Sequence, residues 1–301
     1  MSTPNRRDFL DPAVLARLMA LPLHARHAML GSVSGKHRSP VRGSSLEFAQ
    51  YRKYVPGDDT RRLDWRTWGR SDRFYIKEFE ADTNLRLCLI LDGSGSMGFG
   101  KEGATRLDYA RKICGTLAYL AAQQGDAVGL WSVNGKATSE IPAKRGASHL
   151  GLVLDQLSNA KAAGETRLAS TLHEAAEKIP QRALVVVVSD LFLPPIELKS
   201  ALQHLRFRKH DTAVFHLLDQ AELDFDFDRP ARFVDMEGGE PVLADPSLVA
   251  RQYREAIRLY LAEMDEVIRT TGADYLRVKL HEKYDDVLAR FLLGRTPKGG
   301  R

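Results

Sequence analysis

In the larger, C-terminal part of the chain, short apolar runs alternate with longer segments of helical periodicity. The runs 85–91 and 183–188 are almost wholly apolar, and a carboxylate follows each of them, Asp92 and Asp190. Continuous apolar runs of this length are typical of strands buried on both faces. Within 105–124, apolar residues recur every three or four positions, which predicts an amphipathic helix.

The alternation continues towards the C-terminus. Further strands are expected at 127–133, 212–218 and 275–280, and the turn Asn134-Gly135 leads into a partner strand that ends near Ile141. Further helices are expected at 148–158, 168–179, 195–207, 246–271 and 284–293. This order predicts a doubly wound, mostly parallel, Rossmann-like α/β sheet with helices on both faces. Such sheets bind ligands at the C-terminal ends of their strands.

Three segments are expected. Residues 1–84 read as a helical or irregular segment that packs on the sheet domain, 85–295 form the α/β domain, and 296–301 form a disordered tail. The whole net charge of +5 lies in the first segment, because Lys and Arg balance Asp and Glu in the remainder. That excess is small and mixed with acids, which favours a solvated or partner-facing surface over a nucleic-acid site.

Nothing in the sequence predicts membrane insertion, because the longest apolar run is far shorter than the roughly 20 residues that cross a bilayer. Two cysteines, Cys88 and Cys114, have neither metal-site spacing nor a disulfide framework around them. We therefore expect a cytoplasmic protein with reduced thiols.

The turn at 92–98 contains two overlapping motifs, Asp-x-Ser-x-Ser and Gly-x-Gly-x-x-Gly. A dinucleotide site would need an acidic residue at the end of the second strand, but that strand ends at Asn134. The carboxylate of Asp92 would also repel a phosphate. The glycine pattern is therefore a weaker interpretation than a metal site.

A metal site would use the oxygens that hinder phosphate binding. The expected ligands are Asp92, Ser94, Ser96, Thr166 and Asp190, which come from the turn, a neighbouring loop and the end of the valine-rich strand. Carboxylate and hydroxyl oxygens suit Mg²⁺, or Mn²⁺ and Ca²⁺, rather than a thiolate-loving metal. Each fragment alone also has an ordinary interpretation, since Ser and Gly are common in turns and Asp190 could cap a helix.

Together these residues resemble the metal-ion-dependent adhesion site of von Willebrand factor A domains. The resemblance implies that the two serines and the threonine are direct or near-direct ligands and that the aspartates often act through water. It also implies an open coordination position for a carboxylate of a partner protein.

A second resemblance lies upstream of the turn. Its residues are Glu47-Phe48, Tyr51-Arg52-Lys53-Tyr54, Pro56-Gly57-Asp58-Asp59, Arg61-Arg62-Leu63-Asp64-Trp65, Arg70 and Lys77-Glu78-Phe79-Glu80. This order resembles the domain of unknown function 58 family, which joins such a segment to a von Willebrand factor A-type domain. The resemblance implies a non-catalytic adaptor that works with a MoxR-type AAA+ ATPase in protein remodelling or maturation.

Two other functions stay open. A metal-dependent phosphohydrolase could use the same crevice, although haloacid-dehalogenase-type enzymes carry a second Asp where this chain has Ser94. No motif places a histidine base beside Ser94 or Ser96, which disfavours acyl transfer. Nucleic-acid binding through the N-terminal segment is the other alternative, but Asp58, Asp59 and Asp64 are badly placed for phosphates.

Overall fold

The computed structural model divides the chain into two compact units, one formed by residues 1–27 with 85–301 and the other by residues 28–84. The structure describes residues 7–25, 46–53, 67, 69, 74–81, 85–101, 103–134, 137–180, 182–225, 231–233, 236, 238, 242–244 and 246–296. The first unit holds the α/β domain.

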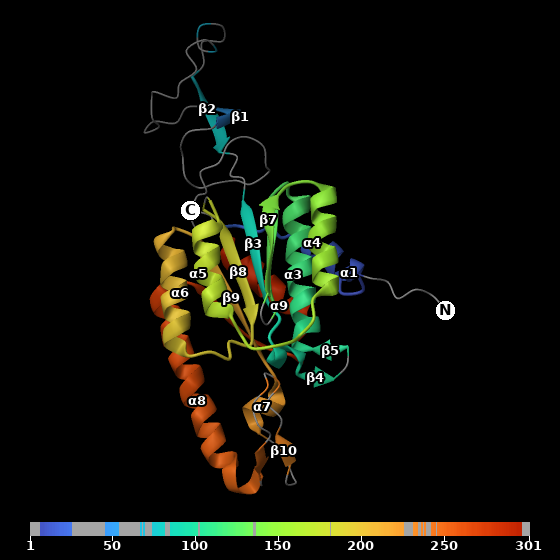
Figure 1. Ribbon diagram of the computed structural model, residues 1–301. Helices are drawn as coiled ribbons and strands as arrows, with labels where there is room; N and C mark the ends of the chain where they lie inside the picture. Colours follow the sequence, from blue (N-terminus) through green and yellow to red (C-terminus); the bar gives the residue numbers. More distant parts are fainter. Residues whose placement is uncertain are drawn as a thin grey trace, which may run out of the picture. The chain divides into compact units, whose positions relative to one another are not determined.

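Its central sheet has six strands. They are β3 (Arg86–Asp92), β6 (Ala127–Asn134), β7 (Ala137–Lys144), β8 (Leu184–Ser189), β9 (Asp211–Leu218) and β12 (Asp274–Lys279). The spatial order is β12-β9-β8-β3-β6-β7, and β7 pairs antiparallel with β6 while the other neighbouring strands are parallel (Figure 1). Counted along the chain this is the order 3-2-1-4-5-6 of doubly wound sheets. The predicted fold class is therefore confirmed.

Helices cover both faces of this sheet. Its helices are α3 (Arg106–Gln123), α4 (Ala147–Asn159), α5 (Leu168–Lys178), α6 (Pro195–Phe207), α8 (Pro246–Thr271) and α9 (Tyr284–Arg295). One core joins α5, α6 and the C-terminal part of α8 to the sheet, while α3 packs with α4 and α9 on the other face (Figure 1). The apolar runs that predicted β3 and β8 are buried almost throughout, because helices lie against both of their faces.

The N-terminal residues 7–25 belong to the unit that contains the sheet. Their helix α1 (Pro12–Leu18) contacts α3 and α9, and Phe9, Leu18 and Leu23 are buried. Arg17 forms ion pairs with two acidic residues of α9, Asp285 and Asp286. The compact units therefore differ from the expected division, which grouped residues 1–27 with 28–84.

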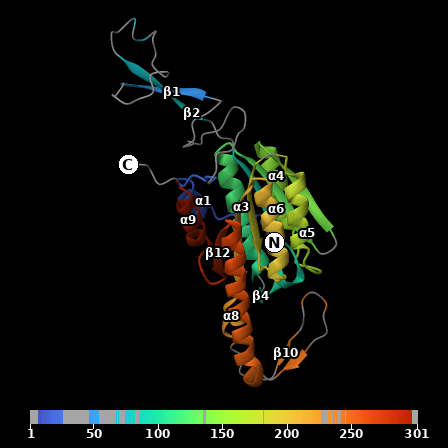
Figure 2. The ribbon, with the colours of Figure 1, turned by 90° about the vertical axis from the view of Figure 1, so that its left-hand side faces the viewer.

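An insertion between β9 and β12 extends beyond the C-terminal ends of the strands. It comprises α7 (Gln220–Asp224), β10 (Ala231–Phe233), β11 (Val242–Ala244) and the first part of α8. Both ribbon views show this part of α8 and β10 well past the sheet (Figures 1 and 2), and Figure 1 shows α7 on the same side. We call it the arm. The arm therefore lies at the C-terminal ends of the strands, where ligands bind in this class of fold.

The second unit contains an antiparallel strand pair, β1 (Leu46–Lys53) and β2 (Tyr75–Ala81), with a register shift between Phe48 and Gln50. From the sequence we expected only helical or irregular structure here. A bulge of this kind interrupts the two-residue alternation by which a strand is recognised. Residues 54–66, which carry much of the motif that resembles the domain of unknown function 58 family, lie outside the described residues. Among the described helices, none is long and apolar enough to cross a membrane.

Candidate metal centre

The candidate site is built around the turn that follows β3. Asp92 ends the strand, and its Oδ1 accepts a hydrogen bond from the backbone N–H of Ser94 at 2.9 Å. A short 3-10 helix, η2 (Gly95–Gly98), carries the chain onward. The hydroxyl oxygens of Ser94 and Ser96 lie 3.0 Å apart, so both serine side chains face the same side of the turn.

The end of β8 supplies the second part of the site. Ser189 donates its hydroxyl hydrogen to Oδ2 of Asp92 at 2.6 Å, and the next residue is Asp190. β3 and β8 are the neighbours at which the strand order reverses, and a crevice forms at that position in doubly wound sheets. Asp92, Ser94 and Asp190 are all buried, whereas Ser96 is half-buried.

A third segment reaches the site from the loop before α5. The carbonyl of Gly164 accepts a hydrogen bond from Gly95 at 2.8 Å, and the N–H of Ala163 donates to Gly93 at 2.9 Å. Thr166 follows two residues later and is half-buried. The loop that carries Thr166 is thus held against the turn by backbone hydrogen bonds on both sides of Ser94.

Arg106, a fully buried cation at the site, was not predicted from the sequence. Its Nη1 lies 2.7 Å from Oδ2 of Asp190 and donates to the carbonyl of Ser96 at 3.1 Å, while Nη2 pairs with Glu222 of α7. Arg106 is the first residue of α3, where the helix dipole disfavours a positive charge. That unfavourable position was the signal in the sequence that a buried anion lies nearby.

The start of α3 is fixed independently of the arginine. Thr105 accepts a hydrogen bond from the N–H of Asp108 at 3.1 Å, and the Asp108 carboxylate accepts one from the N–H of Thr105 at 3.0 Å. This capping box satisfies two backbone donors at the helix terminus. Because Arg106 is the first residue of α3, the capping box fixes its backbone position and so helps to hold the guanidinium at the candidate site.

Burial raises the pKa of Asp92 to about 6, and the negative charge of Asp190 adds to the effect. The hydrogen bonds from Ser189 and Ser94 oppose it by favouring the charged form. At neutral pH the carboxylate is therefore held in a buried position that a nearby positive charge would stabilise.

The donor chemistry of the five residues fits a hard divalent cation. Carboxylate and hydroxyl oxygens are ligands of Mg²⁺, and adjacent ligands about 2.1 Å from an octahedral ion are about 3.0 Å from each other. The hydroxyls of Ser94 and Ser96 have that separation. Within the described ranges no cluster of three or more His, Cys, Asp or Glu side chains is suited to a metal, so the candidate site depends on its hydroxyl groups.

The sheet order and the antiparallel edge strand define a doubly wound α/β domain, and the Asp-x-Ser-x-Ser turn follows the first strand of its sheet. The chain belongs to the family described as "Protein of unknown function DUF58", which matches residues 50–264.

The chain is similar in sequence to uncharacterized bacterial proteins and, at low identity, to solved structures. The uncharacterized protein Rv1480 of Mycobacterium tuberculosis is 27% identical over 295 residues, which are 96% of this chain and 92% of that protein. The uncharacterized protein YeaD of Bacillus subtilis is 29% identical over 135 residues, which are 45% and 31% of the two chains. BatB of Bacteroides thetaiotaomicron, 14% identical, has a TM-score of 0.48 and covers 70% of this chain and 98% of its own. The SpRpn10 VWA domain is 13% identical and has a TM-score of 0.41. The match covers 71% of this chain and 96% of that domain.

Proposed function

We propose that this protein is a non-catalytic adaptor that binds a partner protein through a divalent cation. Asp92, Ser94, Ser96, Thr166 and Asp190 would hold Mg²⁺, or Mn²⁺ or Ca²⁺, and a carboxylate of the partner would take an open coordination position. The observation that carries the proposal is the pair of serine hydroxyls 3.0 Å apart beside the buried Asp92.

The formal charges around the site support a carboxylate ligand. Asp92, Asp190 and Glu222 contribute three negative charges, and Arg106 contributes one positive charge. A bound divalent cation would bring the sum to zero. An incoming Asp or Glu side chain would then meet no net repulsion and could form a direct bond to the ion.

The position of Asp92 favours binding over catalysis. Both of its oxygens accept hydrogen bonds, one from Ser94 and one from Ser189, and its side chain is buried. Haloacid-dehalogenase-type phosphohydrolases, in which Asp92 would be the nucleophile, carry a second Asp two residues further on, and this chain has Ser94 at that position. A grip on a partner needs only that the carboxylate stabilise the ion.

The proposed partner is a MoxR-type AAA+ ATPase that remodels or matures other proteins. This part of the proposal rests on the resemblance of the sequence to a family that accompanies such ATPases. A partner that hydrolyses ATP would place the complex in the cytoplasm, in keeping with the unpaired Cys88 and Cys114.

The test is affinity capture from native cell lysate in Mg²⁺ and in EDTA, followed by mass spectrometry. Wild-type protein in Mg²⁺ should retain an AAA+ ATPase, whereas Ser94→Ala/Ser96→Ala should retain at least tenfold less. Ser170→Ala is the control, because this exposed serine bonds only within its own helix region, to the carbonyl of Arg167. Equal retention of the same proteins with and without metal would rule out the metal-dependent adaptor.

A further inference from the structure

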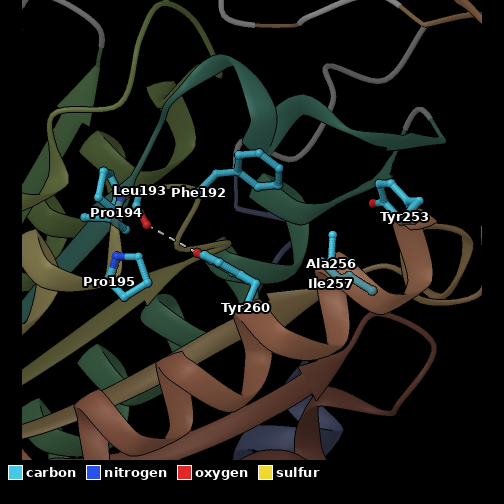
Figure 3. Close-up of a pocket in the computed structure, with 8 residues that line it drawn as sticks. All are labelled: Phe192, Leu193, Pro194, Pro195, Tyr253, Ala256, Ile257 and Tyr260. Carbon is cyan, nitrogen blue, oxygen red and sulfur yellow. Dashed lines mark hydrogen bonds between the residues drawn. The ribbon is translucent and has the colours of Figure 1, made fainter. Parts of the chain in front are cut away.

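An apolar pocket opens beside the candidate site, between the loop after β8 and the arm (Figure 3). Its volume is about 450 Å³, which lies within the range of ligand pockets. Its lining residues are Phe192, Leu193, Pro194, Pro195, Tyr253, Ala256, Ile257 and Tyr260. Figure 3 shows the ring of Phe192 and the side chains of α8 on opposite sides of the space.

The walls of the pocket are held in place. The hydroxyl of Tyr260 donates to the carbonyl of Leu191 and lies 3.4 Å from the carbonyl oxygen of Leu193. Leu191 has a φ of 55°, a strained conformation for a non-glycine residue that the surrounding packing maintains. On the arm, the ring of Tyr253 stacks on Phe225 with centroids 4.3 Å apart. A pocket fixed in this way loses little entropy when it is filled.

The pocket and the candidate metal centre share one loop. The N–H of Phe192 lies 3.4 Å from Oδ1 of Asp190, so the first pocket residue bonds to a candidate ligand of the cation. Phe192 is nevertheless 61% exposed, and Ile196 on the next turn is 69% exposed. Large apolar side chains so exposed beside a functional site are typical of protein-binding surfaces.

The charge around the pocket indicates the kind of partner. The exposed part of α8 that forms one wall carries Arg251, Arg254 and Arg258 against Glu255, a net charge of +2 over residues 249–260. With a bound cation the charges at the candidate site sum to zero, so the positive charge of α8 decides. It favours an acidic segment and disfavours a basic one.

We propose that the pocket receives an aromatic or aliphatic side chain from the partner segment whose carboxylate reaches the cation. The partner's recognition segment would then be acidic and would carry a large apolar residue a few positions from its metal-binding Asp or Glu. The proposal rests on the proposed function, because it assigns a partner motif to the same site. The carboxylate fixes the segment on the ion, and the apolar side chain adds affinity and selects among acidic segments.

The test is selection of a random-peptide display library on the whole protein in Mg²⁺. Enriched peptides should combine Asp or Glu with a nearby Phe, Tyr, Trp, Leu, Ile or Met. Their affinity should fall about tenfold or more in Ile257→Asp, which charges the pocket, and in Phe192→Ser, which alters only an exposed ring. Leu259→Asp is the matched control, because this leucine is 55% exposed on the same helix and does not line the pocket.

The variants separate this inference from the proposed function. Peptides that lose binding in Ser94→Ala/Ser96→Ala but bind both pocket variants like wild type would overturn the pocket and leave the metal site. Peptides that need the pocket but bind equally well in EDTA would retain the pocket and refute the metal-dependent adaptor. Sedimentation tests a second copy of this chain as the occupant. If wild type self-associates and Phe192→Ser does not, the pocket binds another copy and the acidic-partner proposal fails.

Discussion

Burial and the charge of Asp190 together raise the pKa of Asp92 to about 6, compared with about 3.9 in an unfolded chain. Between these two values the folded protein binds the proton more tightly, so stability contributed by Asp92 is lost as the pH rises from about 4 through about 6. The loss amounts to about 3 kcal/mol. Urea unfolding in EDTA across this range should therefore show that wild type loses stability relative to Asp92→Asn as the pH increases.

Magnesium provides the second half of this prediction. Above pH 6, Mg²⁺ that binds the charged carboxylate should restore part of the lost stability to wild type. It should not stabilise Asp92→Asn. Asp126→Asn serves as the control, since this buried carboxylate accepts a hydrogen bond from Leu85 and lies outside the candidate site. If Mg²⁺ stabilised the Asp92 and Asp126 variants equally, the ion would be acting elsewhere on the protein.

At the same scale, the positions of Asp92 and Asp190 at the ends of their strands were predictable, and that of the buried cation beside them was not. Asp92 and Asp190 each follow an apolar strand, and parallel strands end at one edge of a sheet, so the sequence order alone brings them together. Arg106 lies far from Asp190 along the chain, and no local pattern predicts a pair across that separation. Only the unfavourable position of a cation at the first residue of a helix hinted at a partner.

Among the elements, the segment that leads into α1 packs closely against a glycine of α3, Gly115. A Cβ built on Gly115 would lie 2.4 Å from the ring of Phe9, so any side chain there must displace the N-terminal segment. We expect Gly115→Ala to cost about 1–3 kcal/mol of stability. Hydrogen exchange should show lost protection in residues 7–25.

Gly151→Ala provides the comparison for this prediction. Its added Cβ would meet only Arg7, at 3.8 Å, and alanine favours the helix over glycine. This variant should therefore be as stable as wild type or slightly more stable. Unchanged exchange of residues 7–25 in Gly115→Ala would mean that the packing of Phe9 does not hold the segment in place.

Element types were predictable where the periodicity was long and uninterrupted, as in α3, α6 and α8. The strand pair β1 and β2 was missed, and in β1 the register shift between Phe48 and Gln50 breaks the alternation. The pocket could not be foreseen for a different reason. It depends on where the long helix α8 passes the loop after β8, and the pattern of apolar residues fixes the buried face of a helix but not the gaps beside it.

For the molecule as a whole, one buried cation joins segments from both ends of the chain. The guanidinium of Arg295, at the end of α9, hydrogen-bonds both oxygens of Asp211 at 2.8 and 3.2 Å. It also forms an ion pair with Asp274 at 2.6 Å and donates to the carbonyl of His24 at 3.1 Å. Asp211 and Asp274 begin β9 and β12. The last helix, two strands of the sheet and the N-terminal segment therefore share one set of charges.

Removing this charge should weaken the whole sheet-containing unit. Arg295→Met leaves the buried Asp211 and the half-buried Asp274 without their cation, which costs about 3–5 kcal/mol. Arg290→Met, on the same helix, removes only an exposed ion pair with Glu282 and should cost less than about 1 kcal/mol. Hydrogen exchange should show lower protection throughout β3, β8 and β9 in the first variant and wild-type protection in the second. Loss confined to residues 7–25 would instead show that the N-terminal segment unfolds independently of the sheet, because a shared charge network must weaken all the segments it joins.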